Sequence, residues 1–397
     1  MSPSLRFPEF TGEWKEERLS EIADIYKGAG ISKDQLSDNG EPCILYGELY
    51  TKYKTETITE VISRTDIDNT KLVRSKANDV IIPCSGETAE DIATARCVIK
   101  DGILLGGDLN IIRLHNYDGS FVSYQLNGKR KYDIAKVAQG VSVVHLYGEH
   151  LKGVKTVNPC LAEQKKISRF LSLLDERIAV QNRLIDRLQS LMIGLNNSLY
   201  EQYGNDITTS FMELGYSYSG LSGKSAKDFG SGKPFITYLN VYSNIIVDET
   251  DYQYVRINDG EKQNIVRTGD VLFTLSSETP EEVGIGSVYL GEKEVYLNSF
   301  CFGIHIERNQ LAYSPYLSYY VTSTAFRKFI YPFAQGSTRF NLCKADFEKA
   351  SIKLPSLDNQ KRISAMLDCI AEKIRAEKAI LEHYNIQRQY LLRQMFI

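Results

Sequence analysis

The sequence predicts an α+β protein in which two mixed α/β domains are each followed by a long helix. Three observations lead to this prediction: an internal repeat with a period of about half the chain, short strand-like runs in the first part of each half, and a seven-residue apolar period in the last part. The two helices are expected to pair as an antiparallel coiled coil with pseudo-two-fold symmetry. The expected boundaries are domain 1–158, helix 159–204, domain 205–354 and helix 355–397.

The internal repeat consists of pairs of matching segments. They are Glu21–Gly28 with Glu213–Gly220, Asp79–Thr88 with Asp270–Thr279, Ala138–Gly140 with Ala334–Gly336, and Gln164–Ile167 with Gln360–Ile363. The separation is 192 and then 191 residues in the first pairs, and it stays at 196 in the later ones. Drift indicates loop insertions and deletions, which a variable surface tolerates, whereas a constant separation indicates a segment whose geometry forbids them. Each half therefore has a variable module followed by a fixed segment.

The variable modules have the pattern of mixed, strand-rich structure. Short β-branched or aromatic runs bounded by Gly, Asp and Asn predict strands at 80–82, 111–114, 270–273 and 302–306. Residues 123–138 and 315–329 predict one helix in each half, between the strands and the fixed segment.

The fixed segments predict long helices with one apolar face, which we call the seam. Its residues are Ile167, Leu171, Leu174, Ile178, Ile185 and Leu188 in the first segment and Ile363, Leu367, Ile370, Ile374, Leu381 and Leu391 in the second. A heptad seam sustained over about five heptads is typical of a coiled coil, and a buried amphipathic helix in a globular core is the alternative. Gln181 and Glu377 stand at the same seam position in both copies, where a polar residue fixes register at a cost in stability. Met192 and Arg388 also fall on the seven-residue series, 196 residues apart.

The charge balance limits the functions that the chain can perform alone. Lys and Arg total 47 against 50 for Asp and Glu, so the net charge is -3. A protein that binds DNA by itself usually has a basic excess, because its cations neutralise phosphates. The composition therefore disfavours a free-standing DNA binder and is compatible with one that shares the phosphate contacts with partner subunits.

Cysteine and histidine spacing predicts no metal site. The seven cysteines form no CxxC pair and the five histidines form no HxxxH pattern, so free thiols in a reducing compartment are expected. The first ten residues contain no apolar core of a signal peptide, and no stretch reaches the length of a membrane-spanning helix. These observations predict a cytoplasmic protein without a membrane partner.

Catalytic motifs are incomplete wherever they begin. Gly223-Lys224-Ser225 lacks the earlier glycine of a phosphate-binding loop, and Gly28-Ala29-Gly30 lacks the third glycine of a dinucleotide site. Asn158-Pro159-Cys160 does not supply the Asn/Asp-Pro-Pro-aromatic loop of an amino-methyltransferase. The acidic residues after position 86 and after position 277 are interpreted as solvated loops. The chain is therefore predicted to have no catalytic residues and to bind no cofactor.

The repeated block resembles the specificity (S) subunits of type I restriction-modification systems, the HsdS family. The residues that carry the resemblance are Ala138-Gln139-Gly140, Leu146, Pro159 and Glu163-Gln164-Lys165-Lys166-Ile167, seen again as Ala334–Asn341, Leu342, Pro355 and Asn359–Ile363. The opening Phe7-Pro8-Glu9-Phe10, Trp14 and Leu19–Ile22 resembles the N-terminal entry of that family. The copies differ slightly, with Asn359 opposite Glu163 and a looser match after Gly140.

The resemblance implies a non-catalytic subunit with two DNA target recognition domains. It implies a bipartite, asymmetric target on double-stranded DNA, with one half-site for each domain and a spacer set by the helices. It further implies a complex with two methyltransferase (modification) subunits and with restriction/translocase subunits, which would hold S-adenosylmethionine, ATP and Mg. The helices would be the main docking surface for the modification subunits.

Loops in each variable module carry the donors and acceptors that base recognition needs, with cations suited to phosphates. In the first module they are Tyr46, Glu48, Tyr50, Lys52 and Lys54, then Ser85, Glu87 and Thr88, then Gln139, Ser142 and His145. In the second they are Tyr238, Asn240, Tyr242 and Asn244, then Ser276, Ser277 and Thr279, then Gln335, Ser337, Thr338 and Arg339. The alternative function is a non-enzymatic coiled-coil scaffold with two protein-binding modules. An enzyme with an unrecognised site is disfavoured by the lack of convergent catalytic residues.

Overall fold

The computed structural model describes residues 2–68, 70–140 and 143–397, and it divides the chain into two compact units. Unit 1 consists of residues 1–183 and 378–397, and unit 2 consists of residues 184–377. Each unit therefore contains one variable module, part of the first long helix and part of the second.

The central sheet of unit 1 is mixed and largely buried. Its strand order is β2 (Ala23–Lys27), β11 (Leu109–Leu114), β7 (Asp79–Pro83), β9 (Arg96–Val98) and β4 (Thr57–Ile58). A second sheet has the order β5 (Ser63–Thr65), β3 (Glu41–Ile44), β10 (Leu104–Leu105) and β6 (Val73–Arg74). Strand β7 is buried along its whole length, as expected for a strand covered on both faces.

Short helices and paired edge strands complete unit 1. The helices are α1 (Leu19–Ile22), α2 (Glu48–Thr51), α3 (Ala89–Ile92), α4 (Gly119–Asn127), α5 (Lys131–Val137) and α6 (Gly148–Lys152). The paired strands are β1 (Lys15–Arg18) with β13 (Lys155–Asn158), and β8 (Ser85–Gly86) with β12 (Val144–His145).

Unit 2 repeats this plan. Its central sheet has the order β15 (Gly215–Ser219), β22 (Cys301–Ile306), β18 (Val271–Thr274) and β20 (Gly286–Val288). A second sheet has the order β17 (Tyr252–Val255), β16 (Phe229–Ile236) and β21 (Tyr296–Leu297). A third has the order β19 (Ser276–Ser277), β24 (Phe340–Leu342) and β23 (Ala334–Gln335). The strands β14 (Ile207–Ser210) and β25 (Ser351–Leu354) form a two-stranded sheet. The short helices are α8 (Phe211–Leu214), α9 (Tyr238–Ser243), α10 (Ser314–Tyr320), α11 (Thr324–Ile330) and α12 (Lys344–Lys349).

The strand predictions are confirmed, but each predicted module helix is two helices. Residues 123–138 were expected to form one helix, and the structure has α4 and α5 instead. The break falls at Gly128, whose amide donates to the Tyr124 carbonyl and closes α4. In unit 2 the predicted helix over 315–329 is α10 followed by α11, because the side chain of Ser323 accepts from the Phe326 amide and starts a new helix.

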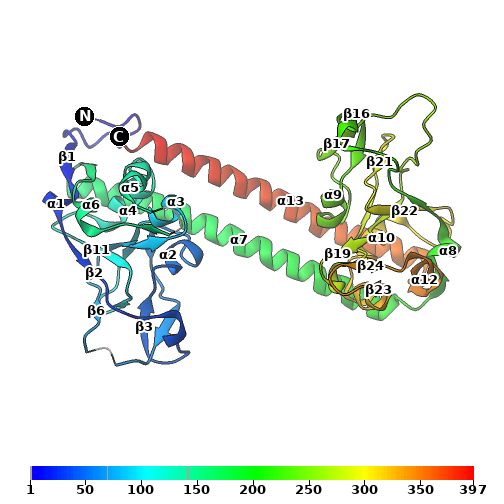
Figure 1. The fold of residues 1–397 in the computed structure, drawn as a ribbon, viewed down its shortest axis with the longest axis horizontal. Coiled ribbons are helices and arrows are strands. Elements are labelled where there is room, and N and C mark those ends of the chain that lie inside the picture. The colour runs from blue at the N-terminus through cyan, green and yellow to red at the C-terminus, as the bar shows by residue number, and fades with distance from the viewer. Residues whose placement is uncertain (1, 69, 141–142) are drawn as a thin grey trace. The chain divides into compact units, whose positions relative to one another are not determined.

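The long helices are α7 (Leu161–Tyr203) and α13 (Leu357–Gln394), and both appear as continuous coils in Figure 1. Within unit 1 the first half of α7 lies beside the end of α13. Two contacts show this: Arg388 contacts Asp175, and Tyr384 lines a small hollow together with Gln181. Higher numbers on α7 thus meet lower numbers on α13. The two helices run antiparallel in this unit, as predicted.

Most of the predicted seam residues lie on the buried faces of the two helices. In unit 1, Ile167, Leu171, Leu174 and Leu391 belong to the main hydrophobic core, and Ile178 packs against it. In unit 2, Ile363 and Leu367 belong to the core formed with Phe211, Phe273 and Phe347. Ile185 and Ile374 are also buried, whereas Leu188, Ile370 and Leu381 are half-buried. Gln181 and Glu377 are both buried, and Glu377 pairs with Lys373 at 2.5 Å.

The repeated glutamine has the same role in both units. Gln164 accepts a hydrogen bond from the Asp118 amide at 2.9 Å and donates to the Pro159 carbonyl at 2.8 Å. Gln360 accepts from the Tyr313 amide at 2.8 Å and donates to the Pro355 carbonyl at 2.8 Å. Each glutamine ties the first turn of a long helix to the segment that precedes a module helix. The contact of each glutamine with the proline five residues before it is the same in both copies, and both residues of this contact keep the separation of 196 residues.

Candidate nucleic-acid interface

Strand pairing brings the second and third predicted loops of unit 2 together. Strand β19 pairs with β24, with Ser276 opposite Asn341 and Ser277 opposite Phe340. Strand β23 pairs with the other edge of β24, with Gln335 opposite Asn341. The serine loop and the Ala-Gln-Gly loop, which are about 60 residues apart in sequence, thus form one small sheet.

The first loop joins this sheet through tyrosines of α9. The Tyr238 hydroxyl donates to the Ser276 carbonyl at 2.8 Å, and the Tyr242 ring stacks on Tyr238 with centroids 6.0 Å apart. Ser277 donates to Glu282 at 3.0 Å, and the hydrogen bond from Tyr242 lowers the pKa of the Glu282 carboxyl, so this group is anionic at neutral pH. We call Tyr238, Ser276, Ser277, Glu282 and Arg339 the loop platform of unit 2.

Arg339 is the exposed cation of this platform. Its Nη2 donates to the Ser276 hydroxyl at 3.3 Å, and its guanidinium carbon lies 5.8 Å from the centroid of the Phe300 ring. Phe300 is 56% exposed, although phenylalanine side chains are usually buried in a hydrophobic core. Phe300 was not among the predicted contact residues, and Glu282 was interpreted as part of a solvated acidic loop. Their only signal was an exposed position beside a strand end, and burial cannot be derived from the sequence.

Unit 1 has the same arrangement of its second and third loops. Strand β8 pairs with β12, with Ser85 opposite His145, and Gln139 and His145 exchange backbone hydrogen bonds of 2.9 and 2.7 Å. The Leu146 amide donates to the Cys84 carbonyl at 2.8 Å, just as the Leu342 amide donates to the Leu275 carbonyl at 2.8 Å. Equivalent backbone contacts therefore hold the third loop in each of the two modules.

A glycine with a positive φ shapes the third loop in each unit. Gly140 has a φ of +125° and Gly336 a φ of +145°. A Cβ at Gly140 would lie 2.1 Å from the Val143 carbonyl oxygen, and one at Gly336 would lie 2.1 Å from the Arg339 carbonyl oxygen. Since both the backbone conformation and the space require glycine, the Gln-Gly pair of the repeat is a turn with a defined geometry.

The predicted contact residues differ in accessibility. The exposed ones are Lys52, Lys54, Glu87, Thr88, Gln139, His145, Thr279, Gln335, Ser337, Thr338 and Arg339. The half-buried ones are Tyr46, Tyr50, Tyr238, Tyr242 and Asn244, and the buried ones are Glu48, Ser85, Asn240, Ser276 and Ser277. Ser142 lies outside the described residues.

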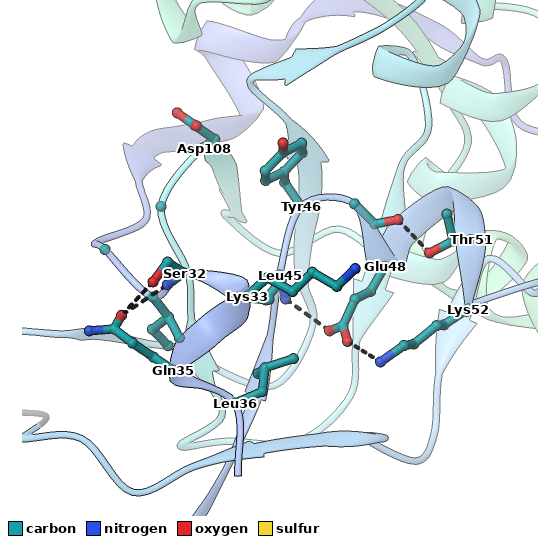
Figure 2. Close-up of a pocket in the computed structure, with 14 residues that line it drawn as sticks. Ser32, Lys33, Gln35, Leu36, Leu45, Tyr46, Glu48, Thr51, Lys52 and Asp108 are labelled. Carbon is teal, nitrogen blue, oxygen red and sulfur yellow. Dashed lines mark hydrogen bonds and ion pairs between the residues drawn. The ribbon is translucent and has the colours of Figure 1, made fainter.

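Glu48 and Asn240 have structural partners. The Glu48 carboxylate accepts from the Leu45 amide at 3.0 Å and pairs with Lys52 at 2.6 Å (Figure 2). It also accepts a hydrogen bond from Ser63. Asn240 is fully buried, and its side chain donates to the carbonyls of Asp248 and Asp251. These side chains position the first loop of each module, and we leave them out of the proposed base contacts.

A cavity of about 820 Å³ opens beside the first loop of unit 1. Figure 2 shows Leu36, Leu45 and Tyr46 along it, with Lys33 and Asp108 also lining it. The cavity lies between the segment after Gly30 and the Tyr46–Lys52 loop, and both segments line it. Ser32–Gln35 was not predicted to lie in this region, because these residues meet the first loop only in the folded module.

The incomplete phosphate-loop motif has a structural explanation. The Lys224 ammonium pairs with Glu261 at 2.6 Å and donates to the Arg256 carbonyl at 2.6 Å, so it is engaged by the segment that follows β17. Among the described residues, no cluster of three His, Cys, Asp or Glu side chains could hold a metal ion. Within the same described residues, no helix combines the length and the apolarity needed to cross a membrane.

Comparisons with known proteins agree with this architecture. A family model described as the type I restriction modification DNA specificity domain matches residues 11–190 and 221–383. The chain is 21% identical over 403 residues to the type I restriction enzyme MjaVIII specificity subunit of Methanocaldococcus jannaschii, covering 95% of this chain and 91% of that protein. It is 27% identical over 150 residues to the type I restriction enzyme StySPI specificity subunit of Salmonella potsdam, covering 38% and 32% of the two chains.

Solved structures show the same fold at low sequence identity. The S subunit of a type I restriction-modification system from M. genitalium superposes with a TM-score of 0.59 at 17% identity, covering 100% of this chain and 99% of that chain. A chain from a structure of the complex assembly and conformational transition of the type I R-M system gives a TM-score of 0.58 at 18% identity, covering 96% and 97%. Because the family model matches both modules and most of the chain, this protein belongs to the type I restriction-modification DNA specificity family and carries two specificity domains.

Proposed function

We propose that this chain recognises a bipartite, asymmetric DNA target, with one half-site for each variable module and a spacer set by α7 and α13. The observation that carries the proposal is the repeated scaffold of the third loop, because its backbone contacts recur in both units while its exposed side chains differ. A common scaffold with different donors and acceptors selects different bases at equivalent positions. Two unlike half-sites follow from two unlike sets of side chains.

The long helices offer a surface for partner subunits. In unit 1 the exposed apolar residues include Leu173 and Val180 on α7 and Ile386 and Tyr390 on α13, each at least 42% exposed. A helix whose seam is already buried has no folding reason for a second apolar stripe, and contiguous exposed apolar surface marks interaction sites. We infer that modification subunits dock on these helices and supply the methylation chemistry with S-adenosylmethionine. Restriction subunits would supply ATP- and Mg-dependent cleavage.

Partner subunits would also resolve the charge balance. With a net charge of -3, the chain alone has no excess of cations to neutralise a DNA backbone. The exposed cations among the predicted contact residues include Lys52 and Lys54 in unit 1 and Arg339 in unit 2. In this proposal the modules read bases and the modification subunits share the phosphate contacts.

Co-expression with the cognate modification subunit tests the proposal directly. Single-molecule sequencing of the host DNA for N6-methyladenine is expected to find one split motif, methylated on both strands. Deletion of either variable module is expected to abolish it, since both half-sites are needed. A stable complex that methylates no motif would contradict the recognition role and favour the scaffold with two protein-binding modules.

The docking surface has its own test. Leu173→Arg with Val180→Arg places two charges on the exposed stripe and is expected to prevent co-purification of the modification subunit. Asn182→Arg is the matched control, because Asn182 is an exposed residue of the same helix that lies off the stripe. Equal co-purification of both variants would contradict docking at this surface.

A further inference from the structure

Arg339 is presented by a rigid turn. Gly336 holds a φ of +145°, and the space for a Cβ there is closed by the Arg339 carbonyl oxygen at 2.1 Å. On the far side of the turn, Asn341 pairs with both Gln335 and Ser276 across the small sheet. The backbone of Arg339 is thus fixed between two strand pairings, although its side chain is exposed.

The guanidinium is held on one side and open on the other. The ring of Phe300 lies 5.8 Å from the guanidinium carbon, and Ser276 takes one hydrogen bond from Nη2 at 3.3 Å. A guanidinium has five N–H donors in a planar fork, so this contact leaves most of them available. A fork that is already oriented loses less entropy when it binds, which favours bidentate recognition over loose charge contact.

The surroundings favour a base over a phosphate. The Ser277 hydroxyl donates a hydrogen bond to the Glu282 carboxylate at 3.0 Å. The charges of Glu282 and Arg339 act on the pKa of Tyr238 in opposite directions, so both groups lie near this tyrosine. An anionic carboxylate in the same platform repels the full negative charge of a phosphate more strongly than it repels the edge of a base pair, which has no net charge. An arginine fork matches the O6 and N7 acceptors of guanine in the major groove.

We propose that Arg339 reads a guanine in the half-site bound by the module of unit 2. This inference rests on the proposed function and adds a specificity-determining residue with its base. The equivalent position in the other copy, 196 residues earlier, is Val143, which is 52% exposed and has no side-chain donor. The Gly140 turn closes on the Val143 carbonyl oxygen at the same 2.1 Å. The same turn therefore carries an arginine in one module and an apolar residue in the other.

The first arm of the test measures the methylated motif. Arg339→Ala is co-expressed with the modification subunit, and N6-methyladenine is mapped by single-molecule sequencing. The expected result is a motif in which one guanine position becomes degenerate while every other position is kept. Arg308→Ala is the matched control, since Arg308 is an exposed arginine that follows β22 at the end opposite Phe300. Its motif is expected to equal that of the wild type.

The second arm measures binding of the purified complex to a duplex in which 7-deazaguanine replaces that guanine. The wild-type complex is expected to lose affinity on the order of 10-fold or more, because the modified base lacks the N7 acceptor. The Arg339→Ala complex is expected to bind both duplexes equally. Co-purification of the variant with the modification subunit, together with an unchanged thermal midpoint, shows that it is folded.

Two results would overturn the assignment. A uniform loss of methylation at every site with an unchanged motif would make Arg339 a phosphate contact, and an unchanged motif with full methylation would remove it from the interface. Both outcomes leave the split motif of the wild type in place. Absence of any motif with the wild-type chain is a different result, because it contradicts the proposed function itself.

Discussion

Arg388 of α13 donates from Nε to the Asp175 carboxylate of α7 at 2.5 Å, and from Nη2 to the Glu56 carboxylate at 2.6 Å. Both carboxylates are 7% exposed, and Tyr124 adds a hydrogen bond of 2.5 Å to Asp175. Arg388 stands at a heptad position, where the other copy has Met192. Unit 1 therefore has a buried ion pair at a seam position that is apolar in unit 2, and this pair joins both helices to the variable module.

Replacing Arg388 by methionine is expected to destabilise unit 1 strongly. Burial raises the pKa of the Asp175 carboxyl, and the arginine is the charge that opposes this effect. Without it two buried carboxylates lose their cation, and breaking such a pair costs about 3–5 kcal/mol in the free energy of unfolding. Urea denaturation followed by circular dichroism measures the loss. Arg393→Met on the exposed face of α13 is the control, and an equally small loss for both variants would contradict the role of the ion pair.

Replacing Gly336 by alanine is expected to disturb recognition while the fold is kept. The added Cβ meets the Arg339 carbonyl oxygen, and the φ of +145° is costly for any L-residue with a side chain, by about 1–3 kcal/mol. The loop is exposed, so the strain is relieved by moving the turn rather than by unfolding the core. DNA binding by the purified complex should weaken at an unchanged thermal midpoint. Gly12→Ala, where no atom lies within 4 Å of the new Cβ, should bind like the wild type.

Acid is expected to weaken unit 2 through Glu261. Hydrogen bonds from Lys224, Asn258 and Gln263 lower the pKa of this carboxyl to about 2, from a usual value of 4.5. A carboxyl whose pKa is lower in the folded state stabilises the fold above pH 4.5, and this contribution is lost as the pH falls toward about 2. Thermal midpoints of the wild type and Glu261→Gln should therefore differ most above pH 4.5 and converge near pH 2. Glu292→Gln, at an exposed carboxylate of the same unit, should show no such convergence.

The spacer proposal predicts a change in the target when α7 is lengthened. Inserting four residues between Gln181 and Leu195 adds about one turn, or roughly 6 Å of helix. At roughly 3.4 Å per base pair this corresponds to one or two additional unread base pairs. Mapping of N6-methyladenine should find both half-sites unchanged and the spacer longer. A spacer of the original length, methylated at the original level, would contradict the idea that the helices measure it.

The sequence by itself determined the features that depend on local periodicity. The seam from Ile167 to Leu391 is visible because a helix returns to the same face every seven residues, whatever surrounds it. The repeated Gln164 and Gln360 were visible because each lies five residues after a proline whose carbonyl it contacts, so this spacing is the same in both copies. The strands at 80–82 and 302–306 were predicted from residue type, since buried strands need β-branched and aromatic side chains.

The tertiary structure alone decided which polar side chains are available to a ligand. Glu48 and Arg339 both lie in predicted loops, yet Glu48 is buried against Lys52 and Ser63 while Arg339 is exposed beside Phe300. Arg388 was placed in the seam by its spacing, and only the fold paired it with Glu56, which lies 332 residues earlier. Burial and ion pairing depend on segments that are distant in sequence and meet only after folding, whereas the heptad pattern depends on the geometry of a single helix.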